Sequence, residues 1–163
     1  MYLIVFAGLP GTGKTTIAKI LAEKIAACYL RVDTIEQALR AEVGAAGYDV
    51  AMALAEQNLM PGRTVVADCV NPVPESRDGW TSAAERAGAK LINVEIICSN
   101  LDEHRRRVES RVADIPGHVL PDWKAVQRHE YIPWTTERLV IDTALCSASV
   151  AIELIEPEIF SAK

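Results

Sequence analysis

Residues 2–15 have the sequence YLIVFAGLPGTGKT, and this stretch decides the fold. Residues 2–7 carry no charge, as expected of a strand that is buried on both faces of a parallel sheet. Residues 8–15 fit the pattern G-x-x-x-x-G-K-[ST], and a segment with helical apolar spacing follows at once. A glycine-rich turn without further function is the alternative, but the flanking strand and helix disfavour it. The order of elements predicts a phosphate-binding loop.

The turn and the helix after it offer several groups that bind phosphate. Glycines let the backbone curl so that its N–H groups point inward, and the helix adds the positive end of its dipole. Lys14 is expected to reach the β- and γ-phosphates of a nucleotide, and the Thr15 hydroxyl to ligate Mg²⁺. We therefore expect ATP to bind at Gly8, Gly11, Thr12, Gly13, Lys14, Thr15 and Thr16.

Composition excludes several classes of protein. The 163 residues are 50% apolar and 24% charged, as in an ordinary single domain. A formal net charge of −5 argues against a nucleic-acid-binding surface, which normally has a basic excess. No apolar stretch approaches the roughly 20 residues of a membrane helix, and a signal peptide is not evident. We expect one domain, residues 1–163, that is cytoplasmic, contacts neither nucleic acid nor membrane, and is a monomer or homodimer.

The four cysteines, Cys28, Cys69, Cys98 and Cys146, stand far apart and form no C-x-x-C pair. A metal site or a disulfide framework would require clustering or an oxidising compartment. Each cysteine lies beside an apolar run, so we expect buried free thiols that pack as small apolar groups.

Strands and helices alternate along the chain. Apolar runs predict strands at residues 2–7, 28–33, 63–68, 90–98 and 138–143. Helical spacing and capping residues predict helices at 14–27, 33–42, 48–59, 75–88, 100–113, 122–130 and 147–159, with a break at 44–47. This alternation indicates an α/β fold with a five-stranded parallel sheet and helices on both faces.

Aspartates stand at the ends of three predicted strands, where α/β sheets bind their ligands: Asp33, Asp68 and Asp142. Beside ATP, one carboxylate can accept the proton of an attacking hydroxyl and another can hold Mg²⁺. We assign the first role to Asp33 and the second to Asp68, because an acid that ends an apolar strand is the Walker B pattern. A helix cap is the alternative for each, and the better interpretation of Asp142.

A basic segment holds two further candidates. Arg107 and Arg111 are one turn apart in the predicted helix 100–113 and would share a face. Guanidinium groups suit phosphate and can neutralise charge on a transferred phosphoryl group. A solvated helix with a Glu103–Arg107 pair is the alternative. The loop that follows contains Pro116 and Gly117, and its residues 112–121 would form a lid.

The motifs resemble those of the small P-loop kinases of the adenylate-kinase-like group, over nearly the whole chain. That group includes gluconate kinase, shikimate kinase, chloramphenicol phosphotransferase and the zeta-toxin relatives. Residues 32–35 are similar to the strand end where chloramphenicol phosphotransferase carries its base. Residues 66–77 resemble the third-strand segment of uncharacterised members. Cys98, Arg107 and Arg111 resemble the lid-helix pattern, in which one arginine lies by the adenine and the other reaches the phosphates.

This resemblance implies a three-layer P-loop NTPase fold with strand order 2-3-1-4-5, which places Asp68 beside the phosphate loop. We assign Arg107 to nucleotide binding and Arg111 to catalysis, and leave open which of them faces the adenine. Glu36 stands where many relatives carry arginine, and the substrate motifs of gluconate kinase are absent. The acceptor therefore stays open between a sugar or sugar acid, a nucleoside or nucleotide, and an antibiotic-like alcohol.

The sequence predicts an ATP- and Mg²⁺-dependent phosphotransferase that acts on a hydroxyl of a small molecule. One alternative is an ATP-binding switch or weak ATPase without an acceptor; another is a nucleotide or polynucleotide kinase, against which the acidic charge counts. A GTPase is disfavoured, because N-K-x-D is absent and the D-x-x-G at Asp114–Gly117 falls in the predicted lid.

Replacing Lys14 tests the phosphate loop. Lys14→Ala should abolish phosphoryl transfer and leave the fold nearly intact, because this side chain serves the phosphates and not the core. Steady-state turnover and circular dichroism measure the two effects. Turnover close to that of the wild type would contradict the assignment.

Overall fold

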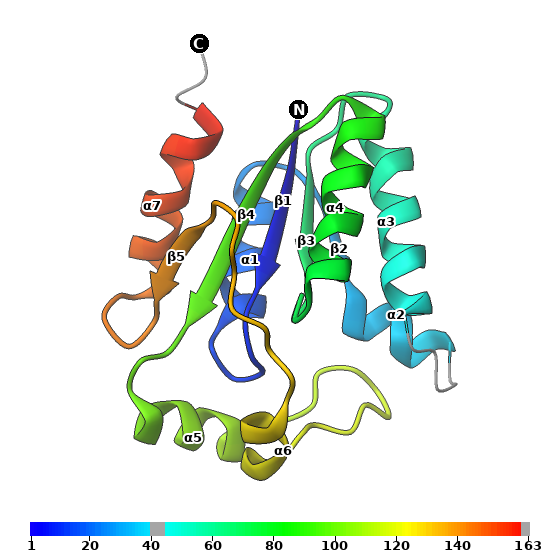
Figure 1. Ribbon diagram of the computed structural model, residues 1–163. Coiled ribbons are helices and arrows are strands. Elements are labelled where there is room, and N and C mark those ends of the chain that lie inside the picture. The colour runs from blue at the N-terminus through cyan, green and yellow to red at the C-terminus, as the bar shows by residue number, and fades with distance from the viewer. Residues whose placement is uncertain (40–44, 161–163) are drawn as a thin grey trace.

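Five parallel strands form a sheet with helices on both faces in the computed structural model of the chain (Figure 1). The structure describes residues 1–39 and 45–160. The strand order is β2-β3-β1-β4-β5, and every neighbouring pair is parallel. The predicted P-loop NTPase fold and strand order are thereby confirmed.

The strands are β1 (Tyr2–Ala7), β2 (Cys28–Arg31), β3 (Val65–Asp68), β4 (Lys90–Ile97) and β5 (Leu139–Asp142). β1 lies in the middle of the sheet, and its residues from Leu3 to Ala7 are fully buried. Phe6 of β1 pairs with Asp68 of β3 on one side and with Val94 of β4 on the other. This register places the carboxylate that ends β3 alongside the loop that follows β1.

The helices are α1 (Lys14–Lys24), α2 (Val32–Leu39), α3 (Ala46–Leu59), α4 (Pro74–Ala87), α5 (Leu101–Ser110), α6 (Trp123–Arg128) and α7 (Ala148–Phe160). α1 and α7 cover one face of the sheet, and α3 and α4 cover the other (Figure 1). α5 and α6 lie beyond the C-terminal ends of the strands. None of the described helices is both long and apolar enough to cross a bilayer.

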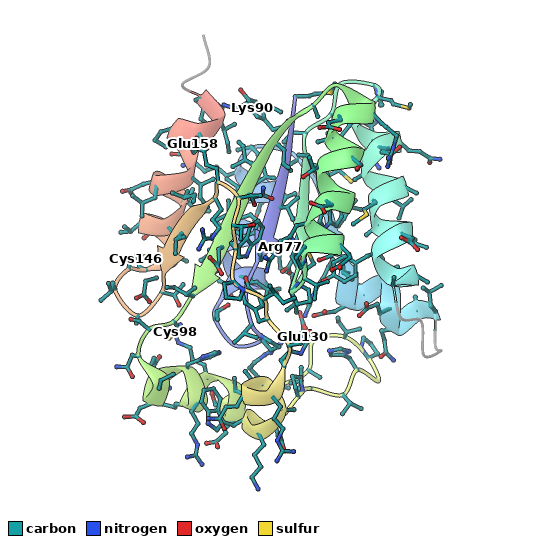
Figure 2. The ribbon with its side chains drawn as sticks, viewed as in Figure 1. Arg77, Lys90, Cys98, Glu130, Cys146 and Glu158 are labelled. Carbon is teal, nitrogen blue, oxygen red and sulfur yellow. The ribbon has the colours of Figure 1, made fainter. Side chains whose placement is uncertain are left out.

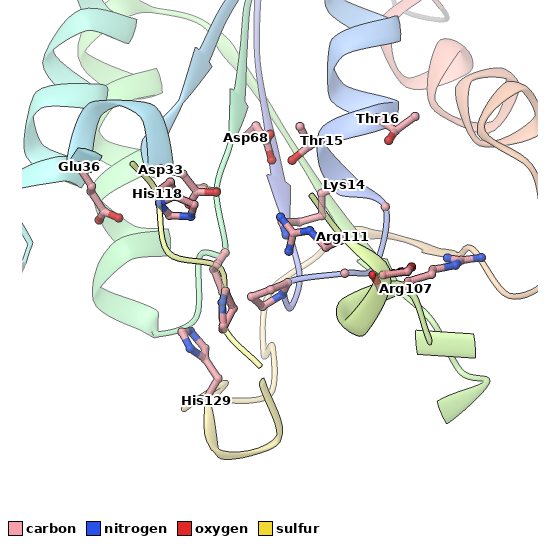
Figure 3. A pocket seen from close by; sticks show the side chains of 17 residues that line it. Lys14, Thr15, Thr16, Asp33, Glu36, Asp68, Arg107, Arg111, His118 and His129 are labelled. Carbon is pink, nitrogen blue, oxygen red and sulfur yellow. Dashed lines mark hydrogen bonds between the residues drawn. The ribbon is translucent and has the colours of Figure 1, made fainter. Parts of the chain in front are cut away.

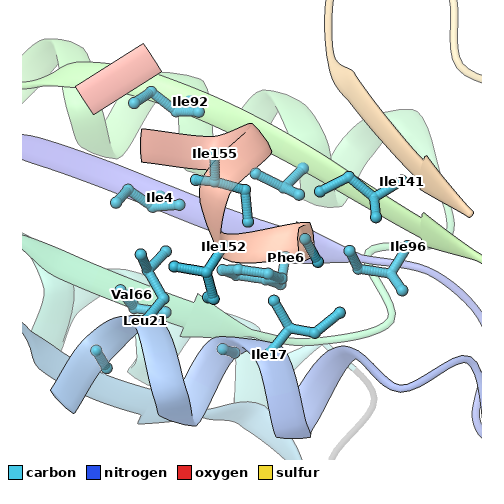
Figure 4. Packing of buried hydrophobic residues seen from close by; sticks show 14 of the residues in the cluster. Ile4, Phe6, Ile17, Leu21, Val66, Ile92, Ile96, Ile141, Ile152 and Ile155 are labelled. Carbon is cyan, nitrogen blue, oxygen red and sulfur yellow. The ribbon is translucent and has the colours of Figure 1, made fainter. Parts of the chain in front are cut away.

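Alternate residues of β1 enter two separate apolar clusters. Ile4 and Phe6 pack with α1 and α7 (Figure 4), whereas Leu3 and Val5 pack with α3 and α4. Each buried side chain of this size contributes roughly 1.5–3 kcal/mol by leaving water. Burial on both faces explains why β1 carries no charge, and it makes β1 a rigid base for the loop that follows.

Two predicted helix ends are wrong, and each has a local cause. α1 ends at Lys24 instead of residue 27, because Ala26 turns into positive φ at 52°. α5 ends at Ser110 instead of residue 113, and Arg111 has extended backbone with φ −65° and ψ 142°. Arg107 and Arg111 therefore do not share a helical face, contrary to the prediction.

The region after β2 also differs from the prediction. α2 begins at Val32, so Asp33 lies in the first turn of this helix instead of ending the strand. α3 begins at Ala46, so Gly47 is helical and not part of a break. The predicted end of the helix at residue 42 and the break at Gly44 lie outside the described residues.

The cysteines are free thiols, as predicted. Cys69 and Cys98 are buried, whereas Cys28 and Cys146 are only partly so (Figure 2). Asp142 acts as a cap, but of the turn after β5: its Oδ1 accepts from the backbone N–H of Ser99 at 3.0 Å and of Ala144 at 2.9 Å.

Arg77 on α4 is buried and fixes a segment that lies far away in the sequence (Figure 2). Its guanidinium lies 4.2 Å from the ring centroid of Trp134. It donates hydrogen bonds of 2.6–3.3 Å to the backbone carbonyls of Asn71, Pro72, Ile132 and Pro133. One side chain thus joins the loop after β3 to residues 131–134.

Arg77→Met should lower the free energy of unfolding by about 3 kcal/mol, because buried carbonyl groups lose their donors. Urea unfolding followed by circular dichroism measures this loss. Arg63→Met is the control, since Arg63 is exposed and makes no ion pair within the described residues. A loss in Arg77→Met no larger than that of the control would contradict the anchoring role.

Candidate active site

A cavity of about 510 Å³ opens where the C-terminal ends of β1, β2 and β3 meet (Figure 3). Its walls come from the phosphate loop, the first two turns of α2, the end of β3, the end of α5 and the α5–α6 loop. The residues that line it include Lys14, Thr15, Asp33, Glu36, Asp68, Arg107, Arg111, His118 and His129. Of the site residues predicted from the sequence, Gly8 and Thr12 do not line the cavity, whereas all the others do.

Two glycines of the phosphate loop are required by close contacts. Gly8 has φ 131°, and a Cβ there would lie 2.1 Å from the carbonyl oxygen of Ile96 on β4. Gly11 has φ 86°, and a Cβ there would lie 2.4 Å from Cγ2 of Val108 on α5. The loop is thus pressed between β4 and α5, and any side chain at these positions would displace it.

Lys14 is buried at the start of α1, and its Nζ donates to the carbonyl oxygen of Leu9 at 3.2 Å. Burial lowers the pKa of the Lys14 ammonium, while the carboxylates of Asp68 and Asp33 act in the opposite direction. Nζ therefore lies within the curl of the loop, where a bound phosphate would provide the negative charge that the site lacks.

Two side chains outside the motif hold the loop, and neither belongs to a local sequence pattern. His104 of α5 is buried, and its Nε2 lies 2.8 Å from the carbonyl oxygen of Pro10. The Thr143 hydroxyl, after β5, lies 2.8 Å from the carbonyl oxygen of Thr12 and 3.1 Å from that of Ile97. Both contacts bring the C-terminal half of the chain against the loop.

The two arginines have different surroundings. Arg107 donates from Nη1 to the Thr143 hydroxyl at 2.8 Å and from Nε to Glu103 at 2.8 Å, so the predicted Glu103 pair is present. Arg111 lines the cavity and makes no ion pair within residues 1–39 and 45–160. Figure 3 shows Arg111 beside Lys14 and Arg107 farther away, toward the turn after β5. Arg111 is thus the arginine whose charge is available inside the cavity.

Asp68 is buried, and it accepts a hydrogen bond of 2.7 Å from the Tyr29 hydroxyl. Burial and the negative charge of Asp68 raise the pKa of Tyr29, so this phenol remains a donor. Asp68 and Thr15 line the same cavity, and Figure 3 shows the two side chains turned toward one another.

These two oxygen donors fit Mg²⁺, which binds through one or two protein ligands together with phosphate oxygens and water. No group of three or more acidic, histidine or cysteine side chains forms a metal site in the described part of the chain. A hydroxyl and one carboxylate beside a phosphate loop do not require such a group.

Arg31 connects three carboxylates, and sequence reasoning missed it. This buried residue ends β2, and its guanidinium lies 2.8 Å from Asp114, 3.5 Å from Asp33 and 3.9 Å from Asp68. Its Nε has no hydrogen-bond partner among the residues that the structure describes. The available signal was a charged residue at the end of an apolar strand, two positions before the candidate base.

Asp114 fastens the α5–α6 loop over the cavity. It pairs with Arg31 of β2 and, at 3.0 Å, with Lys19 of α1. Ile115 beside it is buried, and His118 from the same loop lines the cavity. The loop therefore forms part of the wall of the site.

The far end of the cavity has acidic and imidazole side chains. Asp33 and Glu36 come from successive turns of α2, and His118 and His129 come from the segments around α6. Burial, followed by the charge of Asp33, raises the pKa of Glu36. Burial and then the charge of Lys14 lower the pKa of His129. The histidines were not predicted, because neither belongs to a local motif.

A phosphate loop after the central strand of a 2-3-1-4-5 parallel sheet, with Asp33 in the first turn of α2 and Asp68 at the end of β3, defines a P-loop NTPase. A family profile described as an AAA domain matches residues 3–129. This match covers more than half of the chain, and the chain belongs to that AAA domain family. No curated protein sequence matches this chain.

Solved structures share the fold across nearly the whole chain. A proposed kinase from Chloroflexus aurantiacus has a TM-score of 0.79 and 20% identity, covering 99% of this chain and 97% of its own. An APS kinase from Mycobacterium tuberculosis, solved with AMPPNP and APS, has a TM-score of 0.70 and 20% identity. The match covers 95% of this chain and 97% of the APS kinase chain. A gluconokinase from Sinorhizobium meliloti has a TM-score of 0.65 and 16% identity. The match covers 99% of this chain and 98% of the gluconokinase chain. At these identities the likeness shows the fold.

Asp114→Asn should loosen the α5–α6 loop, because Arg31 and Lys19 lose a charged partner. Amide hydrogen exchange of residues 112–121 should rise about 5-fold, the equivalent of roughly 1 kcal/mol. Hydrogen-exchange mass spectrometry measures this, with Asp49→Asn on the exposed side of α3 as the control. Unchanged exchange in Asp114→Asn would contradict the contact.

The pair of Arg31 and Asp114 also predicts how stability changes with pH. A hydrogen bond from Arg31 holds the pKa of Asp114 well below its usual range. Its contribution to stability is therefore complete above the unfolded pKa of about 3.9 and is lost as the pH falls through the lowered value.

Proposed function

We propose that the protein is an ATP- and Mg²⁺-dependent phosphotransferase that moves the γ-phosphoryl group of ATP to a hydroxyl of a small molecule. One observation carries this proposal: Asp33 lines the same cavity as Lys14 and the phosphate loop. A hydroxyl placed against Asp33 would face the end of a triphosphate held by the loop. A protein that only binds ATP has no need of this arrangement.

The phosphate side of the cavity has a role for each candidate. The backbone of residues 8–13 would cradle the β-phosphate, and Lys14 would reach the β- and γ-phosphates. Arg111 is available to neutralise the charge on the transferred group, whereas Arg107 of α5 would contact the nucleotide. Thr15 and Asp68 would hold Mg²⁺. Bound there, Mg²⁺ would neutralise negative charge on the phosphates.

Asp33 would act as the general base. Its side chain is 32% exposed, so a hydroxyl can reach it, and Arg31 at 3.5 Å orients the carboxylate. A positioned base of this kind contributes about 10²–10⁴-fold to transfer. We further propose that residues 112–121 form a lid, which would keep water away from the γ-phosphate when acceptor is bound.

Asp33→Asn tests the proposal, because the amide keeps the shape of the carboxylate but is a poor base. Acceptor-dependent ADP release should fall about 10²–10⁴-fold. ATP affinity, measured by direct titration, should stay close to that of the wild type. Asp78→Asn on the exposed side of α4 is the matched control.

The acceptor for this test comes from a metabolite panel screened for stimulated ADP release. A flat, low rate with every compound would favour the alternative of a switch or weak ATPase. Full turnover of Asp33→Asn with an identified acceptor would show that the base lies elsewhere or is unnecessary.

A further inference from the structure

The cavity is divided by charge. Lys14, Arg107 and Arg111 lie on the phosphate side, whereas Asp33 and Glu36 lie on the α2 side (Figure 3). Val70 and Pro121 also line the cavity and contribute apolar groups to it. The phosphates of ATP would bind on the cationic side, which leaves the anionic side for the acceptor.

Glu36 has no evident structural partner. It is half-buried one turn after Asp33, and it makes no ion pair or side-chain hydrogen bond within residues 1–39 and 45–160. It packs on the helical Gly47, where an added Cβ would lie 2.3 Å from Cγ of Glu36 and 2.9 Å from Oε1. A half-buried carboxylate beside a second carboxylate is unfavourable unless a cation compensates it.

Two of the cations around the cavity already have partners, and Arg111 lies on the phosphate side beside Lys14 (Figure 3). Arg31 is shared among three carboxylates, and Lys14 lies within the curl of the phosphate loop. Burial lowers the pKa of His129, so this imidazole is neutral at pH 7 and supplies no compensating charge. A carboxylate or phosphate group on the acceptor would therefore meet two like charges at this end of the cavity.

We infer that the acceptor is an amino alcohol or amino sugar, whose ammonium group pairs with Glu36 while its hydroxyl faces Asp33. This inference rests on the proposed function of the same cavity. An ammonium–carboxylate hydrogen bond is about twice as strong as a neutral one, and it would remove the unpaired charge of Glu36. The apolar groups of Val70 and Pro121 would contact the carbon skeleton.

The transfer step balances with these groups alone. The acceptor oxygen forms a bond to the γ-phosphorus as the bond from that phosphorus to the β–γ bridging oxygen breaks. The hydroxyl proton passes to Asp33, and ADP leaves with the electron pair of the broken bond. The ammonium group keeps its proton and takes no part in the chemistry.

Calorimetric binding to the full chain with AMPPNP and Mg²⁺ tests the inference. The probes are amino alcohols and amino sugars, each beside its N-acetyl derivative, which keeps the skeleton and removes the charge. D-Glucosamine, D-glucose and D-gluconate form a matched set of one cation, one neutral compound and one anion. We expect amines to bind about 10-fold more tightly than their N-acetyl forms.

Variants assign the preference to Glu36. Glu36→Gln should bring the amine-to-acetyl ratio close to one without changing the affinity for AMPPNP. Glu23→Gln, on the exposed side of α1, should leave the ratio unchanged. Arg40→Gln is included because Arg40 stands four positions after Glu36 and lies outside the described residues; it should leave the ratio unchanged as well.

Three outcomes would overturn the inference: no amine in the panel binds more tightly than its N-acetyl form, Glu36→Gln keeps the preference, or the preference appears only in Arg40→Gln. ADP release measured on the same compounds separates this from the proposed function. Transfer confined to neutral or anionic acceptors contradicts the amine inference alone. An amine that binds through Glu36 without being phosphorylated contradicts the kinase proposal alone.

Discussion

The close contact between Gly8 and the carbonyl oxygen of Ile96 is the constraint on which the rest of the site depends. β1 is fixed between two layers of helices, and β4 runs beside it, so the chain leaving β1 has room only for backbone. Gly11 likewise has no room for a side chain, because Val108 of α5 lies beside it. The loop therefore takes its curl from packing on both sides, and its N–H groups are oriented before any phosphate arrives.

From this loop outward, the site is organised by charge. Arg31, buried at the end of β2, draws together carboxylates from α2, β3 and the α5–α6 loop, which are far apart in the sequence. Separated from Arg31, these carboxylates would repel one another around a triphosphate site. A single buried cation thus lets acidic groups for metal binding and for proton transfer lie close to the phosphates, and it ties the candidate lid to them.

Local patterns in the sequence predicted the phosphate loop, because its glycines, Lys14 and Thr15 are adjacent. They also predicted that Asp33 and Asp68 face one cavity, since parallel strands end at one edge of a sheet. Arg31, His118 and His129 were missed, because only the folded chain brings these isolated residues together. The end of α5 was misplaced because no glycine or proline follows until Pro116, so no residue near Ser110 signals the end of a helix.

Topology also explains how one fold of this kind can accept different substrates. The cations that would hold ATP come from the start of α1 and from the C-terminal end of α5. His104 and Thr143 fasten this region to the phosphate loop. The groups that would meet the acceptor come from α2 and from the segment after α6. α2 packs mainly on α3. A substitution such as glutamate for arginine at position 36 can therefore change the charge offered to the acceptor while the phosphate site stays as it is.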